Sequence, residues 1–160
     1  MNPPFADAVP ETVRYYLDRI AHVLEMLSRE PDPQRFLAIR LAPDSLETAV
    51  NFAIAIRFAA RVLCPPAGRE PPDLPDVYTC ESLLSYKAAI DRIIAPIAAS
   101  DLRHPVSHIA GLAQIEQEPA DYITRFALPN MIFHFTMAYA GLRHGGMRIG
   151  KADFDGQHRY

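Results

Sequence analysis

The stretch that decides the fold is "LAPDSLETAVNFAIAIRFAARVLCPP", residues 41–66. Pro43 suits the first turn of a helix, and Asp44 with Glu47 is typical of a capping pair that accepts otherwise unbonded backbone N–H groups. The residues that follow are mostly apolar as far as the pair of prolines at the end. We therefore expect a helix from about Asp44 to Leu63.

This apolar run argues for a core helix and against a membrane span. Arg57 and Arg61 interrupt it, and it is shorter than the roughly 20 residues that a bilayer requires. The N-terminal residues 1–13 have neither the positive start nor the apolar centre of a secretion signal, so we expect a cytoplasmic protein. The formal net charge is -3 and the sixteen Lys and Arg residues are scattered. Nucleic acid is therefore not an expected partner.

Two further helices are expected on either side of this one. Upstream, apolar residues recur at the three-and-four spacing that places side chains on one helical face. They are Val13, Leu17, Ile20, Leu24 and Leu27. Downstream, five prolines between positions 65 and 75 predict a stiff connector, long enough to run the length of a bundle. A third helix follows, capped by Thr79 and fraying near Pro96.

The segment "RHPVSHIAGLAQIEQEP", residues 103–119, alternates apolar and polar residues more than it follows a helical period. It predicts a small hairpin or an irregular loop excursion before the last helix. His104 and His108 fall in this segment beside a proline, and we place both at the surface.

The last helix is expected to open at Pro119, to kink at Pro129 and to stop at the two glycines 145–146. Four helices with almost no strand signal indicate an all-α bundle, with a long crossover between the second and third helices. A chain of 160 residues, 49% of them apolar, is long enough for one domain with a substantial core. We therefore expect a single domain over residues 1–160.

Two motifs and their spacing resemble a known family. They are "RLAPDS" at Arg40–Ser45 and "RFALPNMIFHFTMAYAGLRHGGMRIGKADFDG" at Arg125–Gly156. The chain resembles a family of unknown function, found in bacteria and fungi, within the DinB/YfiT-like superfamily of four-helix bundles. The resemblance extends over nearly the whole chain. It implies an up-down-down-up bundle, often a homodimer, with a pocket near one end.

The resemblance also raises the question of a metal. In better-known DinB-like members three histidines hold a divalent ion, one on the second helix and two at H-x-x-x-H spacing on the last, and metal-dependent thiol transfer and hydrolysis are attributed to such members. Here His134 stands at the last of these positions, while Asn130 and Ala53 stand at the other two. Asparagine is a weak ligand and alanine is none, so we expect no metal, and no motif for another cofactor is visible.

His134 lies in an otherwise apolar helix and is the leading catalytic candidate. Asn130, Ala138 and Gly141 share its helical face. The small side chains at 138 and 141 could leave room for a ligand beside an imidazole that exchanges protons near neutral pH. Alternatively, Ala138 and Gly141 let another helix approach closely, and His134 makes a hydrogen bond within a packed core. The sequence leaves both alternatives open.

The second helix supplies further candidates for substrate binding. Asn51, Ala53 and Arg57 occupy positions where the resembled family tends to carry polar residues, which indicates a pocket reshaped for a particular ligand. Arg57 could grip a carboxylate or phenolate if it turned inward, or cover apolar surface if it turned outward. On the last helix, Tyr139 could belong to a polar cluster with Arg143 near the bundle end.

Three functions remain possible from these residues. The first, which we favour, is a metal-independent enzyme of the isomerase, cyclase or lyase type, for which a biosynthetic pathway is one setting. It would act on a small, largely apolar organic molecule, with His134 as acid and base and with Asn130 and Arg57 orienting an oxygen. The second is a non-catalytic binding or dimerisation module. The third is a DinB-like metal-dependent transferase or hydrolase. A homodimer is expected in each case.

Overall fold

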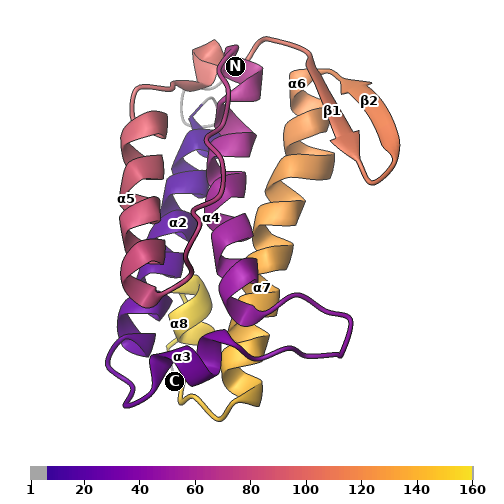
Figure 1. Cartoon of the computed structure of the whole chain (residues 1–160). Coiled ribbons are helices and arrows are strands. Elements are labelled where there is room, and N and C mark those ends of the chain that lie inside the picture. The colour runs from indigo at the N-terminus through magenta and orange to yellow at the C-terminus, as the bar shows by residue number, and fades with distance from the viewer. Residues whose placement is uncertain (1–6, 160) are drawn as a thin grey trace.

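Helix α4 (Thr48–Leu63) is the helix against which the other three long helices pack. The computed structural model describes residues 7–159, and its other long helices are α2 (Ala8–Leu27), α5 (Cys80–Ile94) and α7 (Leu128–His144). Figure 1 shows α4 and α5 running in one direction and α2 and α7 in the other. The predicted all-α, up-down-down-up bundle is confirmed.

The composition of α4 explains its central position. Twelve of its sixteen residues are buried, so nearly every face of the helix contacts protein. By length and composition alone, the segment Thr48–Ala67 could cross a membrane, but 72% of its most apolar window is buried inside the bundle. Its apolar side chains are therefore already covered by the neighbouring helices, which is typical of the core helix of a globular protein.

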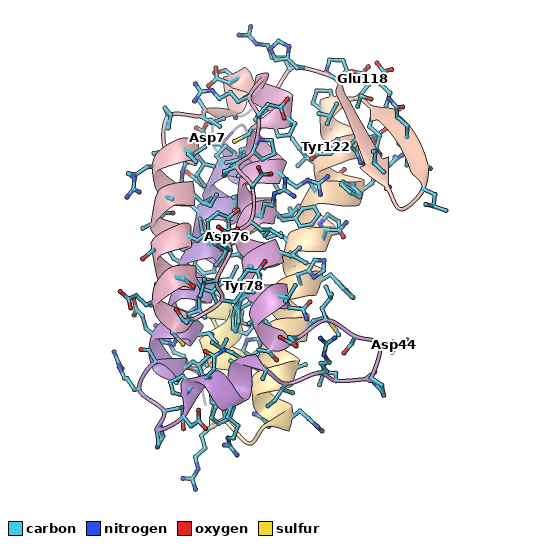
Figure 2. The ribbon with its side chains drawn as sticks, in the orientation of Figure 1. Asp7, Asp44, Asp76, Tyr78, Glu118 and Tyr122 are labelled. Atoms are coloured by element: carbon cyan, nitrogen blue, oxygen red, sulfur yellow. The ribbon has the colours of Figure 1, made fainter. Side chains whose placement is uncertain are left out.

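The predicted start of α4 at Asp44 is wrong by four residues. Asp44 is exposed at the tip of the loop before the helix (Figure 2) and caps nothing. Glu47 is the residue that precedes the helix, and its carboxylate accepts a hydrogen bond of 2.9 Å from Arg40. The contact between Glu47 and Arg40 thus shapes the loop, although Arg40 is not part of the apparent capping pair. The connection between α2 and α4 also contains a short helix, α3 (Pro33–Leu37).

The predictions for α2 and α5 are confirmed. All five apolar residues of the predicted stripe on α2 are fully buried. Thr79 caps α5 through a reciprocal pair of bonds, in which its Oγ1 accepts from the Ser82 N–H at 3.1 Å and Ser82 Oγ accepts from the Thr79 N–H at 2.9 Å. Residues 64–79, called the crossover below, pass along the bundle from the end of α4 to the start of α5 (Figure 1). The crossover begins with a 3₁₀ turn, η1 (Pro65–Ala67).

The excursion before the last helix is a hairpin, as predicted. Strands β1 (Val106–Ala110) and β2 (Ala113–Gln117) pair antiparallel, and a 3₁₀ turn, η2 (Ala99–Asp101), precedes them. Side chains on a strand alternate between two faces, and on β1 Val106 and His108 face the protein. The placement of His108 at the surface is therefore wrong, because only 9% of it is exposed.

The last helix is built from three pieces. A short α6 (Pro119–Asp121) leads into a π-helix, η3 (Tyr122–Ala127), which continues as α7. The N–H of Leu128 bonds to the carbonyl of Ile123, five residues back, where an α-helix would use the residue four back. The irregularity expected as a kink at Pro129 thus lies in the turn before the proline, which has no N–H to continue regular bonding.

The C-terminal segment folds back onto the bundle. Helix α7 stops at the two glycines as predicted, and a short α8 (Lys151–Asp155) follows. The Phe154 ring stacks on Phe135 with centroids 4.4 Å apart, and Tyr139 meets the edge of Phe154 at 5.6 Å. The limits of the predicted domain at residues 1–6 and 160, and part of the segment judged to lack a secretion signal, lie outside the described residues.

Small residues allow α4 and α7 to approach closely. Gly141 is buried, and a Cβ atom added to it would overlap Oγ1 of Thr48 and lie 3.3 Å from its Cβ. The Thr48 hydroxyl cannot easily turn away, because it donates to the carbonyl of Ile39 at 3.1 Å. Ala138 is also fully buried. The space that these small residues leave is therefore occupied by α4.

We predict that Gly141→Ala destabilises the protein by about 1–3 kcal/mol, the usual cost of overpacking a well-filled core. Alanine is a better helix former than glycine by up to about 1 kcal/mol, so a loss would show that the α4–α7 contact outweighs propensity. Urea unfolding followed by circular dichroism measures the change. Gly150→Ala is the matched control, since an added Cβ there meets nothing within 4 Å. Equal stability of the two variants would contradict the prediction.

Candidate functional site

His134 on α7 and Asn51 on α4 form a hydrogen-bonded pair across the bundle. Nδ1 of His134 lies 2.9 Å from Oδ1 of Asn51. The Asn51 side chain is fixed, because its Nδ2 donates to the carbonyls of Leu46 at 3.3 Å and Glu47 at 3.1 Å. These two bonds orient the amide so that its oxygen faces the imidazole. His134 therefore carries its proton on Nδ1 and donates it to Asn51.

The other ring nitrogen of His134 is left as a base. Within residues 7–159, Nε2 has no hydrogen-bond partner. Burial lowers the pKa of His134 below its ordinary value, which keeps the imidazole neutral at neutral pH. Phe58 lies nearly parallel to the ring at 6.0 Å, and the Phe133 ring stands edge-on at 5.1 Å. The result is a neutral base of fixed tautomer, held by an orienting group and bordered by aromatic rings.

The other predicted residues of this site do not join the pair. Asn130 turns back on its own helix and donates to the Phe126 carbonyl at 2.7 Å. Ala53 and Ala138 are fully buried in the helix packing, so neither side chain is open to a ligand in this structure. Tyr139 packs on the C-terminal segment. Of the residues proposed from the sequence, only Asn51 is brought into contact with His134.

Arg57 faces the crossover and not His134. Its Nε donates to the carbonyl of Pro72 at 2.9 Å, and Nη2 lies 3.6 Å from a carboxylate oxygen of Asp73. Together with Arg61 and His108 it lines a cavity of about 560 Å³ beneath the hairpin, which His134 does not line. From the sequence we expected His108 at the surface and did not propose Arg61 as a site residue. The two-residue period of a strand puts His108 on the same face as the apolar Val106, and this was the signal in the sequence that His108 points inward.

A continuous row of rings connects His134 to this cavity. The aromatic row consists of His134, Phe58, Phe126 and His108. Beyond the His134–Phe58 contact, ring centroids are 5.9 Å apart between Phe58 and Phe126 and 4.1 Å apart between Phe126 and His108. The guanidinium of Arg61 lies over Phe58 at 4.6 Å and over Phe126 at 5.3 Å. Tyr122, labelled in Figure 2, lies at the hairpin end of this row and also lines the cavity.

The residues around His134 do not fit a divalent metal. Among residues 7–159, no group of three or more His, Cys, Asp or Glu side chains is placed to hold one. The amide of Asn130 is used by its own helix, and Ala53 offers no ligand atom. One histidine and the amide of Asn51 fall short of the three or more good ligands that a stable divalent site requires.

Comparison with known proteins places the chain in a family. Residues 5–155 match the family described as a domain of unknown function (DUF1993). The chain belongs to this family. The fold is also similar to the crystal structure of a DinB family member protein from Shewanella denitrificans, with a TM-score of 0.82 and 20% identity over 98% of this chain and 94% of that chain. At this identity the likeness shows the fold alone. None of the curated proteins compared with the chain matches it.

The lowered pKa of His134 predicts a specific dependence of stability on pH. In the unfolded chain the pKa of His134 is near its ordinary value of 6.5, above its folded pKa, so the unfolded state binds a proton first as the pH falls. As the pH falls from that value to the lower folded pKa, protonation of His134 in the unfolded chain lowers the free energy of unfolding. Urea unfolding at a pH above and a pH below this range should show a smaller decrease in the free energy of unfolding for His134→Gln than for the parent protein. An identical pH dependence in both would contradict the lowered pKa.

Proposed function

We propose that this protein is a metal-independent enzyme that moves protons on a small, largely apolar organic molecule, with His134 as its acid and base. The observation that carries the proposal is the bond from His134 Nδ1 to the buried Asn51 amide, which fixes the ring so that Nε2, without a hydrogen-bond partner in residues 7–159, can act as a base. A base held by an orienting group is the arrangement that proton-transfer enzymes use.

The pair supports proton transfer in both directions. When Nε2 of His134 removes a proton from a substrate C–H or O–H group, the ring becomes an imidazolium. Its bond to Asn51 is then charge-assisted and stronger, which stabilises the charge that develops. The lowered pKa makes that imidazolium a better proton donor, so the same nitrogen can return the proton to another atom of the substrate. Isomerisation requires no other exchange. In an elimination the returned proton goes to the leaving group, whose bond to carbon breaks as the double bond forms, and in a cyclisation it goes to the atom that the new ring bond leaves negatively charged.

The surroundings favour this chemistry over nucleophilic catalysis. Burial raises the pKa of the Cys64 thiol to about 11, so the thiol stays protonated and is a poor nucleophile at neutral pH. The groups that border His134 are the aromatic rings of Phe58 and Phe133, and Phe133 is 55% exposed. An apolar substrate could lie on this surface, with its reacting atom at Nε2.

The apolar helix α4 offers no dimer seam, because α2, α5 and α7 cover it within one chain. The homodimer therefore remains a proposal that rests on the family resemblance, and the cytoplasmic location remains one that rests on the sequence. Light scattering tests the first, and a monomer at micromolar concentration would count against it.

We predict that His134→Gln keeps the fold and lowers turnover by about a hundredfold or more, the usual effect of losing a proton-transfer group. Asn51→Ala should cost less, about 0.5–1.5 kcal/mol of transition-state stabilisation, and should shift the acidic limb of the pH–rate profile. Asn130→Ala is the matched control and should have little effect, because its amide bonds to its own helix. Steady-state kinetics with the native substrate decide the matter. A folded His134→Gln variant with undiminished turnover would return His134 to a packing role.

Metal analysis separates this proposal from the metal-dependent alternative. We predict that the purified protein holds no stoichiometric zinc, nickel or iron, because Ala53 and Asn130 replace two ligands of the three-histidine set. Elemental analysis by mass spectrometry measures the content. About one metal per chain, lost in His134→Ala but retained in His22→Ala, would favour the metal-dependent transferase or hydrolase.

A further inference from the structure

We propose that the cavity beneath the hairpin is a second ligand site, which binds a small organic carboxylate carrying a hydroxyl group. The cavity has a volume of about 560 Å³ and lies between α4, the crossover and β1. Small-molecule sites usually measure about 300–1,000 Å³. The cavity is thus large enough for a ligand of one or two rings, and three of its lining residues, Arg57, Arg61 and His108, supply polar recognition.

The two arginines provide positive charge that the nearby carboxylates neutralise only weakly. Arg57 and Arg61 are one helical turn apart on α4. No carboxylate within residues 7–159 pairs with Arg61, whose guanidinium is held flat over two aromatic rings. The carboxylate of Asp73 is 3.6 Å from Arg57 and its side chain is fully exposed, so that contact is weak. A planar carboxylate fits the fork of N–H groups that a guanidinium presents.

His108 supplies an independent observation. It is 91% buried and lines the cavity, and its Nε2 lies 2.7 Å from Oε1 of Gln117. The amide oxygen accepts, so Nε2 carries the proton and Nδ1 is an acceptor. Within residues 7–159, Nδ1 has no hydrogen-bond partner and is fully buried. A buried polar atom without a partner is costly, and a small shift of β1 toward the cavity would let a hydroxyl group on the ligand donate to it.

The remaining walls favour an organic monoanion over inorganic phosphate. Val106, Ile109 and Tyr122 present apolar surface to the cavity, which suits a hydrocarbon body. Glu70 also lines the cavity. Its negative charge repels a dianion more strongly than a monoanion. We therefore expect the ligand's carboxylate to bind the two arginines, its hydroxyl group to bind His108, and its apolar body to fill the space between them.

This site is independent of the chemistry proposed for His134. His134 does not line the cavity, and within the aromatic row Phe58 and Phe126 lie between it and His108. If His134 has no catalytic role, the proposed carboxylate site is unaffected. If the cavity does not bind a carboxylate, the proton-transfer proposal for His134 is unaffected. His134→Gln should therefore bind the carboxylate as the parent protein does.

Binding of 4-hydroxybenzoate, measured by calorimetry and by protein-detected NMR, tests the charge. The neutral 4-hydroxybenzamide should bind at least about tenfold more weakly, because hydrogen bonds between two charged groups are the stronger ones. Arg61→Gln should abolish the preference for the carboxylate. Arg125→Gln removes the same charge from η3 outside the cavity and should bind like the parent. Equal binding of acid and amide, equal binding by the two variants, no binding at millimolar concentration, or tighter binding of phenyl phosphate would each overturn the proposal.

His108→Phe tests the hydroxyl. The replacement keeps a ring against Phe126 and Tyr122 and removes the unpaired nitrogen, so circular dichroism should show a preserved fold. The parent protein should prefer 4-hydroxybenzoate to benzoate, and His108→Phe should bind both equally while still preferring benzoate to benzamide. A hydroxyl preference that survives in His108→Phe would overturn the assignment of His108.

Discussion

The close approach of α7 to α4 is the constraint on which the other features of this bundle depend. Gly141 and Thr48 set the distance between the two helices, because the Thr48 side chain packs directly against the backbone of Gly141. At that distance Asn51 reaches His134, and Phe58 lies against the same imidazole. The contact that fills the core therefore also builds the site. Of the two alternatives that the sequence left open, the close packing of Ala138 and Gly141 and the hydrogen bond of His134 within the bundle are observed, while Nε2 of His134 has no hydrogen-bond partner within residues 7–159.

Most of the fold could be predicted from local signals. The stripe on α2, the cap at Thr79 and the glycine stop after α7 each depend on residues close in sequence, and each is confirmed. The start of α4 could not be predicted in this way, because Glu47 bonds to Arg40 and the apparent cap at Asp44 is left in the loop. A pattern of capping residues indicates which hydrogen bonds can form at the start of a helix. Which of them forms depends on whether another residue competes for the same side chain.

The site was less predictable for a related reason. His134 was recognisable as a polar residue within an apolar helix, and Asn51 as a polar residue on the neighbouring one. The directions of the other side chains depend on partners distant in sequence or on irregular backbone. A carbonyl of the crossover holds Arg57, a carbonyl beside the π-helix holds Asn130, and the pleat of a hairpin turns His108 inward. None of these partners can be identified from residue spacing alone.

The π-helix η3 has a consequence for comparing this chain with other bundles. A π turn holds about one residue more than an α turn, and one residue corresponds to about 100° of rotation around a helix. Tyr122, the first residue of η3, is fully buried and its hydroxyl donates to the carbonyl of Arg61. When this chain is aligned with a bundle whose last helix is regular, and the alignment is matched from Leu128 onward, Asn130 and His134 fall at equivalent positions. Residues before η3 are then displaced by one position, unless a gap is placed within η3.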